Sequence, residues 1–215
     1  VLRLKKGAVI EISNGRGKDF SARIISVSIE KIELDIIEEL NRVTESPIDI
    51  ILCSGMLKDN KMDFVIKHVT QLGITKWIPF FSERSIPNPD AKRMGKRCER
   101  WETIAKESLK QCLRSRLPEI CMPLNFETLL TLPGPSDLKL AFWEKASRKL
   151  LTLREEKNVA RVFILIGPEG GFSENEMDQA VQKGFIPCSL GPRILRAETA
   201  SIAACTLIQH IFGDI

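Results

Sequence analysis

The sequence contains no tyrosine and only two histidines, and aromatic residues make up 6% of its 215 residues. No run approaches the roughly 18 consecutive apolar residues that a membrane-spanning helix needs. The opening residues, VLRLKK, lack the apolar stretch of a signal peptide. The six cysteines include no Cys-X-X-Cys pair, which excludes the common zinc-binding and disulfide patterns. We therefore expect a cytoplasmic chain with reduced thiols, no membrane segment and no metal centre.

What the sequence does contain is typical of a folded protein. Apolar residues make up 43% of the chain and charged residues 28%, so the chain can bury a sizeable core. Its length is enough for one large domain, or for one domain with a smaller one beside it. The sequence starts with valine and opens like the middle of a strand, and we therefore expect that the original N-terminus is missing from it.

The positive charge is concentrated in one part of the chain. The net charge of the whole chain is +4, but residues 84–116 carry ten basic and four acidic side chains and so contribute +6. Such a run is typical of a solvated helix face, and it is also typical of a surface that binds phosphate groups. Composition alone leaves both interpretations open.

The first part of the sequence has the period of β-strands. Between residues 8 and 37, apolar side chains alternate with polar ones in short runs. The segment NGRG at residues 14–17 can adopt the positive φ angles that a tight hairpin needs. Residues 38–47 are polar and contain a proline, which is typical of a domain boundary. We therefore predict a small antiparallel sheet or barrel over residues 1–43, followed by a second domain over residues 44–215.

After this boundary, apolar runs with the length of strands alternate with segments of helical periodicity. Strands are predicted over residues 48–53, 74–81, 138–143, 162–166 and 185–190. Helices are predicted over residues 59–72, 91–113 and 201–212. Ser173 and Glu176 have the spacing of a capping box, which predicts a further helix that begins there. This alternation predicts an α/β fold, in which helices cover a parallel sheet.

Two glycine-containing loops follow strands of this sheet. Residues 167–171 read GPEGG directly after one strand, and residues 191–200 read GPRILRAETA after another. Ligands of open α/β sheets bind outside the carboxyl ends of the strands, where glycine lets them approach the main chain closely. The phosphate-binding patterns GxxxxGK[ST] and GxGxxG do not occur at these loops. The loops are therefore expected to hold a cofactor between their main chains, although such glycine pairs also mark ordinary turns.

The two loops together resemble the signature loops of a known family. The strings IGPEGGFS at residues 166–173 and LGPRILRAETA at residues 190–200 are similar to those of the bacterial ribosomal RNA uracil-N3 methyltransferases, a family of the SPOUT class of knotted methyltransferases. The resemblance includes KMDF at residues 61–64 and spans nearly the whole chain. It departs from the family at QCLR, residues 111–114, where the family usually has a small residue and a glycine between glutamine and arginine.

The resemblance implies a fold and a cofactor. The fold is a parallel-sheet methyltransferase domain with a C-terminal trefoil knot, which follows a PUA-like RNA-binding barrel. The protein is expected to be a homodimer and to bind S-adenosylmethionine, bent between the two loops. The residues implied for cofactor binding are Ile166, Gly167, Pro168, Glu169, Gly170, Gly171, Leu190, Gly191, Ile194, Leu195, Thr199 and Ala200.

The implied activity is methylation of N3 of one uridine in the 16S ribosomal RNA of the small ribosomal subunit. Methyl transfer from a sulfonium requires alignment of the reacting atoms and removal of one proton. Arg196 is expected to stabilise the deprotonated uracil, and Glu198 or Glu169 could accept the proton. A glutamate near a helix start more often serves as a cap or as a partner of the helix dipole, and this interpretation is favoured for both residues. The RNA is expected to be held by Arg84, Arg93, Arg97, Arg114, Arg116 and Arg193.

Two other functions stay open at this point. One is another SPOUT enzyme that methylates a ribose hydroxyl of transfer RNA. The amino-acid sequences of the two loops disfavour it. The other is a non-catalytic RNA-binding assembly protein, which the intact glycine loops disfavour. The sequence does not specify the nucleotide, or whether the substrate is naked RNA or an assembled subunit.

Overall fold

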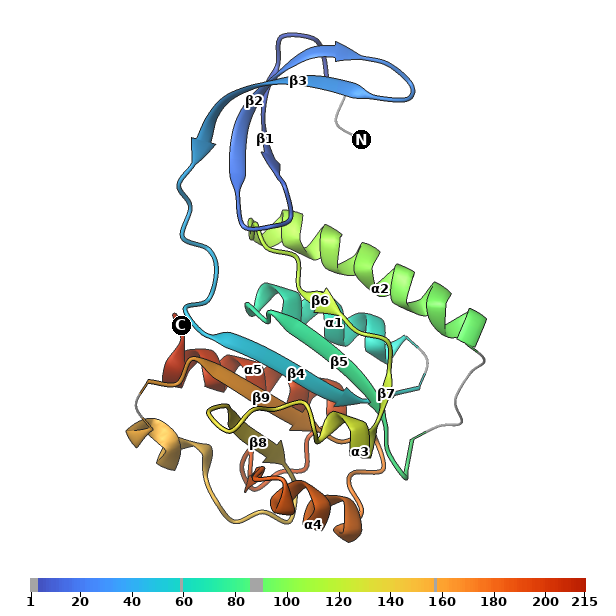
Figure 1. Ribbon diagram of the computed structural model, residues 1–215, viewed down its shortest axis with the longest axis vertical. Coiled ribbons are helices and arrows are strands. Elements are labelled where there is room, and N and C mark those ends of the chain that lie inside the picture. Colours follow the sequence, from blue (N-terminus) through green and yellow to red (C-terminus); the bar gives the residue numbers. More distant parts are fainter. Residues whose placement is uncertain (1–3, 59, 86–90, 157) are drawn as a thin grey trace.

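The computed structural model describes residues 4–58, 60–85, 91–156 and 158–215. Within them, the chain forms an antiparallel sheet at its N-terminal end and a larger parallel sheet flanked by helices (Figure 1). An extended segment after the third strand joins the two parts. The predicted α/β fold with an antiparallel sheet before it is therefore confirmed.

The N-terminal sheet has the strand order β1-β2-β3. Its strands are β1 (Val9–Ser13), β2 (Asp19–Val27) and β3 (Ile32–Leu40). The side-chain oxygen of Asn14 stabilises the first hairpin, because it accepts hydrogen bonds from the main-chain nitrogens of Arg16 (2.8 Å) and Lys18 (3.2 Å). The described strands form a three-stranded antiparallel sheet, which is the small sheet that the sequence predicts.

The larger sheet has the order β10-β8-β9-β4-β5-β6, with β7 beside β5, and all its described pairs are parallel. Its strands are β4 (Asp49–Gly55), β5 (Lys76–Phe81), β6 (Glu119–Ile120), β7 (Leu124–Asn125), β8 (Leu138–Phe142), β9 (Arg161–Ile166) and β10 (Ile186–Cys188). Parallel strands bring their carboxyl ends to one edge of the sheet. The segments after β4, β8, β9 and β10 therefore meet at that edge.

Helices cover both faces of this sheet. The helices are α1 (Lys61–Gln71), α2 (Ala91–Cys112), α3 (Phe126–Leu129), α4 (Glu174–Gln182) and α5 (Ala197–Phe212), with a 3-10 helix, η1 (Leu150–Glu155), before β9. Ile50 and Leu52 of β4 pack in one core with α1, α2 and α5, whereas the alternate residues Ile51 and Cys53 pack in a second core with α3 and α4. The trefoil knot implied by the resemblance stays a prediction.

The long helix α2 is amphipathic, as its sequence predicts. Its apolar residues Met94, Cys98, Trp101 and Ala105 are buried in the first core. The ring of Trp101 meets that of Trp77 in β5 edge to face, with 5.0 Å between the ring centroids. This packing fixes the position of the basic face of the helix, which lies on the side away from the core.

Candidate active site

A cavity of about 560 Å³ lies at the carboxyl ends of the parallel strands. The loop after β9 and the loop after β10 form much of its wall. Of the residues that the resemblance implies for cofactor binding, the wall contains Ile166, Gly167, Pro168, Glu169, Gly170, Gly171, Leu190, Gly191, Ile194, Leu195 and Ala200. Arg193, Arg196 and Glu198 lie in the same wall. The structure therefore brings the two sequence loops around one common space.

Thr199 is the exception among the residues expected to bind the cofactor. It is exposed in the first turn of α5 and is not part of the cavity wall, whereas its neighbours Glu198 and Ala200 are. The assignment of Thr199 to cofactor binding stays a prediction.

The first loop is anchored where it enters α4. The hydroxyl of Ser173 accepts a hydrogen bond from the main-chain nitrogen of Glu176 (3.2 Å), and the Glu176 carboxylate accepts one from the main-chain nitrogen of Ser173 (2.9 Å). This confirms the predicted capping box. The second carboxylate oxygen of Glu176 accepts a hydrogen bond from the main-chain nitrogen of Glu83 (2.9 Å), after β5. The loop is thus tied to two neighbouring elements.

The middle of the first loop packs directly on the end of β4. A Cβ atom added to Gly55 would lie 2.5 Å from the main-chain nitrogen of Pro168 and 2.7 Å from its Cδ atom. No side chain can occupy that space unless the backbone moves. The loop also needs glycine at Gly171, whose φ is +67°.

We expect Gly55→Ala to raise the Kd for the cofactor by about 10-fold or more and to lower the free energy of unfolding by about 1–3 kcal/mol, because overpacking displaces the loop. Calorimetry and urea denaturation measure the two effects. Gly95→Ala is the matched control, since a Cβ atom added at Gly95 in α2 meets open space. Equal results for the two variants would contradict the account of the loop.

The second loop follows β10 and ends where α5 begins. The Ser189 hydroxyl donates a hydrogen bond to the main-chain oxygen of Gly191 (3.1 Å) and lies 3.2 Å from the Gly191 nitrogen, from which it accepts one. These contacts close a tight turn. Arg196 occupies the N-cap position of α5 with an extended backbone. The helix N-terminus and this guanidinium together make the adjoining part of the cavity favourable for negative charge.

Two polar atoms in the cavity wall are buried without a hydrogen-bond partner among the described residues. They are Nε1 of Trp143 and Oε2 of Glu198. Buried polar atoms are nearly always paired in folded proteins. A donor and an acceptor that both lack partners in one wall therefore indicate a polar ligand.

Lys61, in the first turn of α1, forms an ion pair with Glu169 of the first loop. The hydrogen bond to Glu169 raises the pKa of Lys61, to which the charges of Glu169 and Glu198 also contribute, whereas burial and Arg196 oppose the rise. The Lys61 amine therefore stays protonated at neutral pH. The Glu169 carboxylate is paired with this cation, whereas Oε2 of Glu198 has no hydrogen-bond partner within residues 4–58, 60–85, 91–156 and 158–215.

The sequence reasoning missed several residues of the cavity wall. Trp143 and Glu144 follow β8, which is parallel to β9. Ligands bind outside the carboxyl ends of such strands, so the segment after β8 could have been predicted to line the site as well. Lys61 belongs to the segment KMDF of the resemblance, but it was not assigned a role. Lys58 and Phe172 are two further residues of the wall that were not assigned a role.

Two of the arginines expected to bind RNA lie at the cavity. Arg193 is an exposed residue of the cavity wall. Arg84 is exposed after β5, and its Nη1 atom donates a hydrogen bond to the main-chain oxygen of Gly170 (2.9 Å). Arg84 thus supports the first loop from outside.

Three further arginines from this set lie in or after α2. Arg93 and Arg116 are exposed. Arg97 is partly exposed, and its guanidinium lies over the ring of Trp101, 5.4 Å from the centroid. These three side chains therefore lie at the protein surface.

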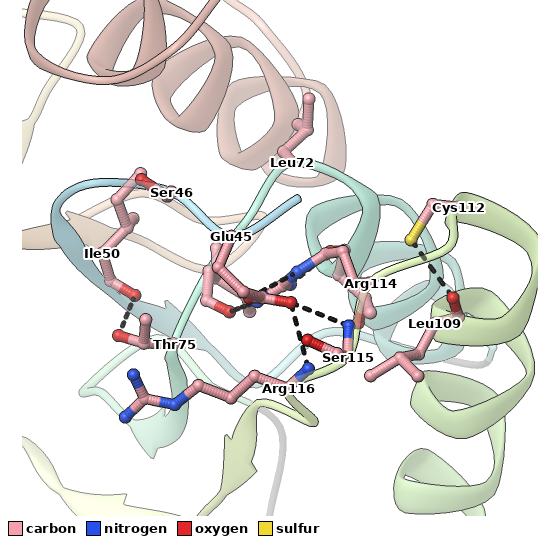
Figure 2. A network of polar contacts seen from close by, with 12 residues as sticks. Glu45, Ser46, Ile50, Leu72, Thr75, Leu109, Cys112, Arg114, Ser115 and Arg116 are labelled. Carbon is pink, nitrogen blue, oxygen red and sulfur yellow. Dashed lines mark hydrogen bonds and ion pairs between the residues drawn. The ribbon is translucent and has the colours of Figure 1, made fainter. Parts of the chain in front are cut away.

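Arg114 differs from the other five arginines because it is buried, with 3% of its surface exposed. Its Nε and Nη2 atoms donate to one carboxylate oxygen of Glu45, at 3.1 and 2.7 Å (Figure 2). Nη1 donates to the main-chain oxygen of Thr70 (2.6 Å), and Nη2 to that of Ile74 (3.1 Å). The expectation that Arg114 contacts RNA is therefore wrong, because its donors are used inside the protein.

The same network shapes the turn after α2. Leu113 has a φ of +61°, in the left-handed region that favours glycine, and this is the position where the resembled family usually has glycine. The second carboxylate oxygen of Glu45 accepts hydrogen bonds from the main-chain nitrogens of Ser115 (2.9 Å) and Arg116 (3.0 Å). Glu45 therefore holds a turn that contains a strained leucine.

Arg114→Met is expected to lower the free energy of unfolding by about 3 kcal/mol, because it leaves the Glu45 charge and two main-chain oxygens without their buried partner. Urea denaturation measures this change. Arg116→Ala, at an exposed neighbour, is expected to change it by less than about 0.5 kcal/mol. A stable Arg114→Met protein would show that the network contributes little.

The chain is similar to known proteins over its whole length. Residues 44–209 match the RNA methyltransferase domain family, and residues 1–37 match the RNA methyltransferase PUA domain family. The chain is 35% identical to the ribosomal RNA small subunit methyltransferase E of Buchnera aphidicola subsp. Acyrthosiphon pisum (strain APS), over 100% of its own length and 84% of that protein. The chain belongs to the ribosomal RNA small subunit methyltransferase E family. Another member, from Bacillus subtilis (strain 168), is 32% identical over 98% of this chain and 84% of that protein.

Solved structures support the same family. A ribosomal RNA small subunit methyltransferase E from Neisseria gonorrhoeae, bound to S-adenosyl methionine, matches with a TM-score of 0.91 and 30% identity over 99% of this chain and 87% of that one. A methyltransferase from Legionella pneumophila, in complex with the bound cofactor SAM, gives a TM-score of 0.91 and 31% identity over the same shares. In the part of the chain that is described, no helix is long and apolar enough to cross a bilayer.

Proposed function

We propose that the protein transfers a methyl group from S-adenosylmethionine to N3 of one uridine in the 16S ribosomal RNA of the small ribosomal subunit. The observation that carries this proposal is the cavity between the two glycine loops, in a fold that it shares with a family member bound to S-adenosyl methionine. N3 is preferred to a ribose hydroxyl because both loop sequences resemble those of the uracil-N3 enzymes.

The cavity fits this cofactor. Main-chain groups of residues 190–195 are proposed to hold the adenine, and those of residues 167–171 the methionine part. Nε1 of Trp143 is a buried donor that no described residue pairs with, which suits an acceptor atom of the cofactor. The close packing of Gly55 on Pro168 keeps the first loop in place against the sheet.

The chemistry requires little of the protein beyond alignment and one proton transfer. When bound, the cofactor supplies a methyl group on a sulfonium, which leaves as a neutral thioether. Glu198 accepts the N3 proton, since no described residue is a hydrogen-bond partner of its buried Oε2 atom in the cavity wall, whereas Lys61 engages Glu169. Arg196 stabilises the negative charge that develops on the uracil oxygens. The freed N3 electron pair then forms the bond to the methyl carbon.

The substrate is proposed to lie along a basic surface that leads to the cavity. Arg84, Arg93, Arg97, Arg116 and Arg193 supply its charge, and the N-terminal sheet supplies a second contact area. This assignment divides the chain into an RNA-binding domain, residues 1–43, and a methyltransferase domain, residues 44–215. A protein that modifies bacterial ribosomal RNA is further proposed to work in the cytoplasm.

The protein is also proposed to be a homodimer. The terminal helix α5 supports this, because its apolar residues Ile202, Leu207, Ile211 and Phe212 are only partly buried within the chain. A second copy would cover them. Sedimentation of the purified protein measures its oligomeric state.

Mass spectrometry of nucleosides tests the proposed function. Small ribosomal subunits that lack the modification are incubated with the protein and S-adenosylmethionine, and their RNA is digested. We expect 3-methyluridine as the product. A 2'-O-methylated nucleoside would instead assign the protein to the ribose methyltransferases. Absence of any product, together with absence of cofactor binding in calorimetry, would assign it to the non-catalytic RNA-binding proteins.

A further inference from the structure

The tip of the β1–β2 hairpin is attached to the segment after α2. The main-chain nitrogen of Gly17 donates a hydrogen bond to the main-chain oxygen of Ser115 (3.0 Å), and that of Leu117 donates to the oxygen of Gly15 (3.0 Å). The hydroxyl of Ser13 donates to the same Ser115 oxygen (3.1 Å), across 102 positions of sequence. The hairpin and this segment therefore pair like two short antiparallel strands.

This pairing places two arginines directly opposite each other. Arg16 and Arg116 form an antiparallel bridge, so that their side chains leave the paired segments on the same side. Both residues are exposed, and neither guanidinium has an ion pair among the described residues. Figure 2 shows the Arg116 side chain extending away from the Glu45 carboxylate. Like charges opposite each other on paired strands are destabilising, so an anion between them would be bound favourably.

The backbone at both arginines is held in place by hydrogen bonds to side chains of the protein, without a bound ligand. The side chain of Asn14 accepts a hydrogen bond from the nitrogen of Arg16 (2.8 Å). The carboxylate of Glu45 accepts one from the nitrogen of Arg116 (3.0 Å), and Glu45 is itself fixed by the buried Arg114. The two guanidinium groups therefore need little ordering of the backbone to act together.

We propose that Arg16 and Arg116 form a clamp that binds one backbone phosphate of the RNA substrate, across the junction of the N-terminal sheet and the methyltransferase domain. The guanidinium group presents several donors in a plane, which suits the oxygens of a phosphate. The identity of the anion as RNA rests on the proposed function. The clamp gives the N-terminal sheet a definite task, which is to hold the RNA at a fixed place relative to the catalytic domain.

The double variant R16A/R116A tests the clamp. Its affinity for a fragment of small-subunit ribosomal RNA is measured at several salt concentrations, without the cofactor. We expect binding about 10- to 100-fold weaker at low salt, and a slope of log K against log salt that is smaller by about 1. The Kd for S-adenosylmethionine is expected to stay unchanged. The melting temperature is expected to stay the same or to rise, because the repulsion between the two charges is removed.

The matched control R154A/K183A also removes two exposed positive charges, from η1 and from the end of α4. These elements lie far from the hairpin (Figure 1), and the control is expected to bind RNA like the wild type. If R16A/R116A unfolds, R16K/R116K replaces it, since lysine keeps the charge but not the planar donors. RNA affinity equal to that of the wild type or of the control would overturn the clamp. The nucleoside product tests the proposed function separately, because RNA affinity is measured without methyl transfer.

Discussion

Glu198→Gln lowers kcat for RNA methylation by about 100-fold or more, because a positioned proton acceptor contributes roughly 10²- to 10⁴-fold to such reactions. Glu198 lies in the first turn of α5 and lines the cavity, and its Oε2 atom is buried without a hydrogen-bond partner in the part of the chain that the structure describes. Glutamine keeps the shape of the side chain but does not accept the N3 proton. Single-turnover kinetics with S-adenosylmethionine and ribosomal RNA measure the effect.

Two controls separate proton transfer from binding. Glu169→Gln removes the ion pair with Lys61 and is expected to lower kcat by less than about 10-fold, since Glu169 is not the acceptor. RNA that contains 5-fluorouridine has a more acidic N3–H group, and the loss caused by Glu198→Gln is expected to be smaller on it. Equal losses for the two glutamates, or equal losses on both RNAs, would show that Glu198 is not the acceptor.

Arg196→Met is expected to lower kcat by about 100- to 1,000-fold, which is the effect of removing one preorganised group that stabilises negative charge in a transition state. Arg196 occupies the N-cap position of α5, in the cavity wall, and the helix N-terminus adds to its positive potential. Methionine keeps much of the length of the side chain and removes the charge. The Kd for S-adenosylmethionine is expected to change little, because the charge on uracil develops only during the reaction.

Arg193→Met is the matched variant for this prediction. Arg193 lies in the same loop and the same cavity wall, but we assign it to RNA binding. Its loss is expected to raise KM for RNA and to leave kcat nearly unchanged. If Arg196→Met also changed only KM, Arg196 would be an RNA contact and not a catalytic residue.

The strands of the sheet and the long helices could be predicted because their signals are local. β4 and β9 are continuous apolar runs, and α2 has one apolar face. The elements β6, β7, α3 and η1 have between two and six residues, which is too short for a period to show. Helix α5 begins at Ala197 and not near residue 201, because the first turn coincides with a segment that reads as part of a loop.

The candidate site was predictable to the extent that it consists of consecutive residues. The two glycine loops could be found for that reason. Gly55 could not, because its importance comes from Pro168, which lies far along the chain. The wrong assignment of Arg114 has the same origin, since Glu45, which neutralises it, is 69 residues away. Arg16 gained a role only when the fold placed it opposite Arg116.

A crystal structure of the protein soaked with S-adenosylmethionine tests the central claim most directly. The account predicts density for the cofactor in the cavity between residues 167–171 and residues 190–195, with a partner for the indole nitrogen of Trp143. Density for the cofactor at any other place on the chain, with this cavity empty, would contradict the assignment of the site and of the reaction.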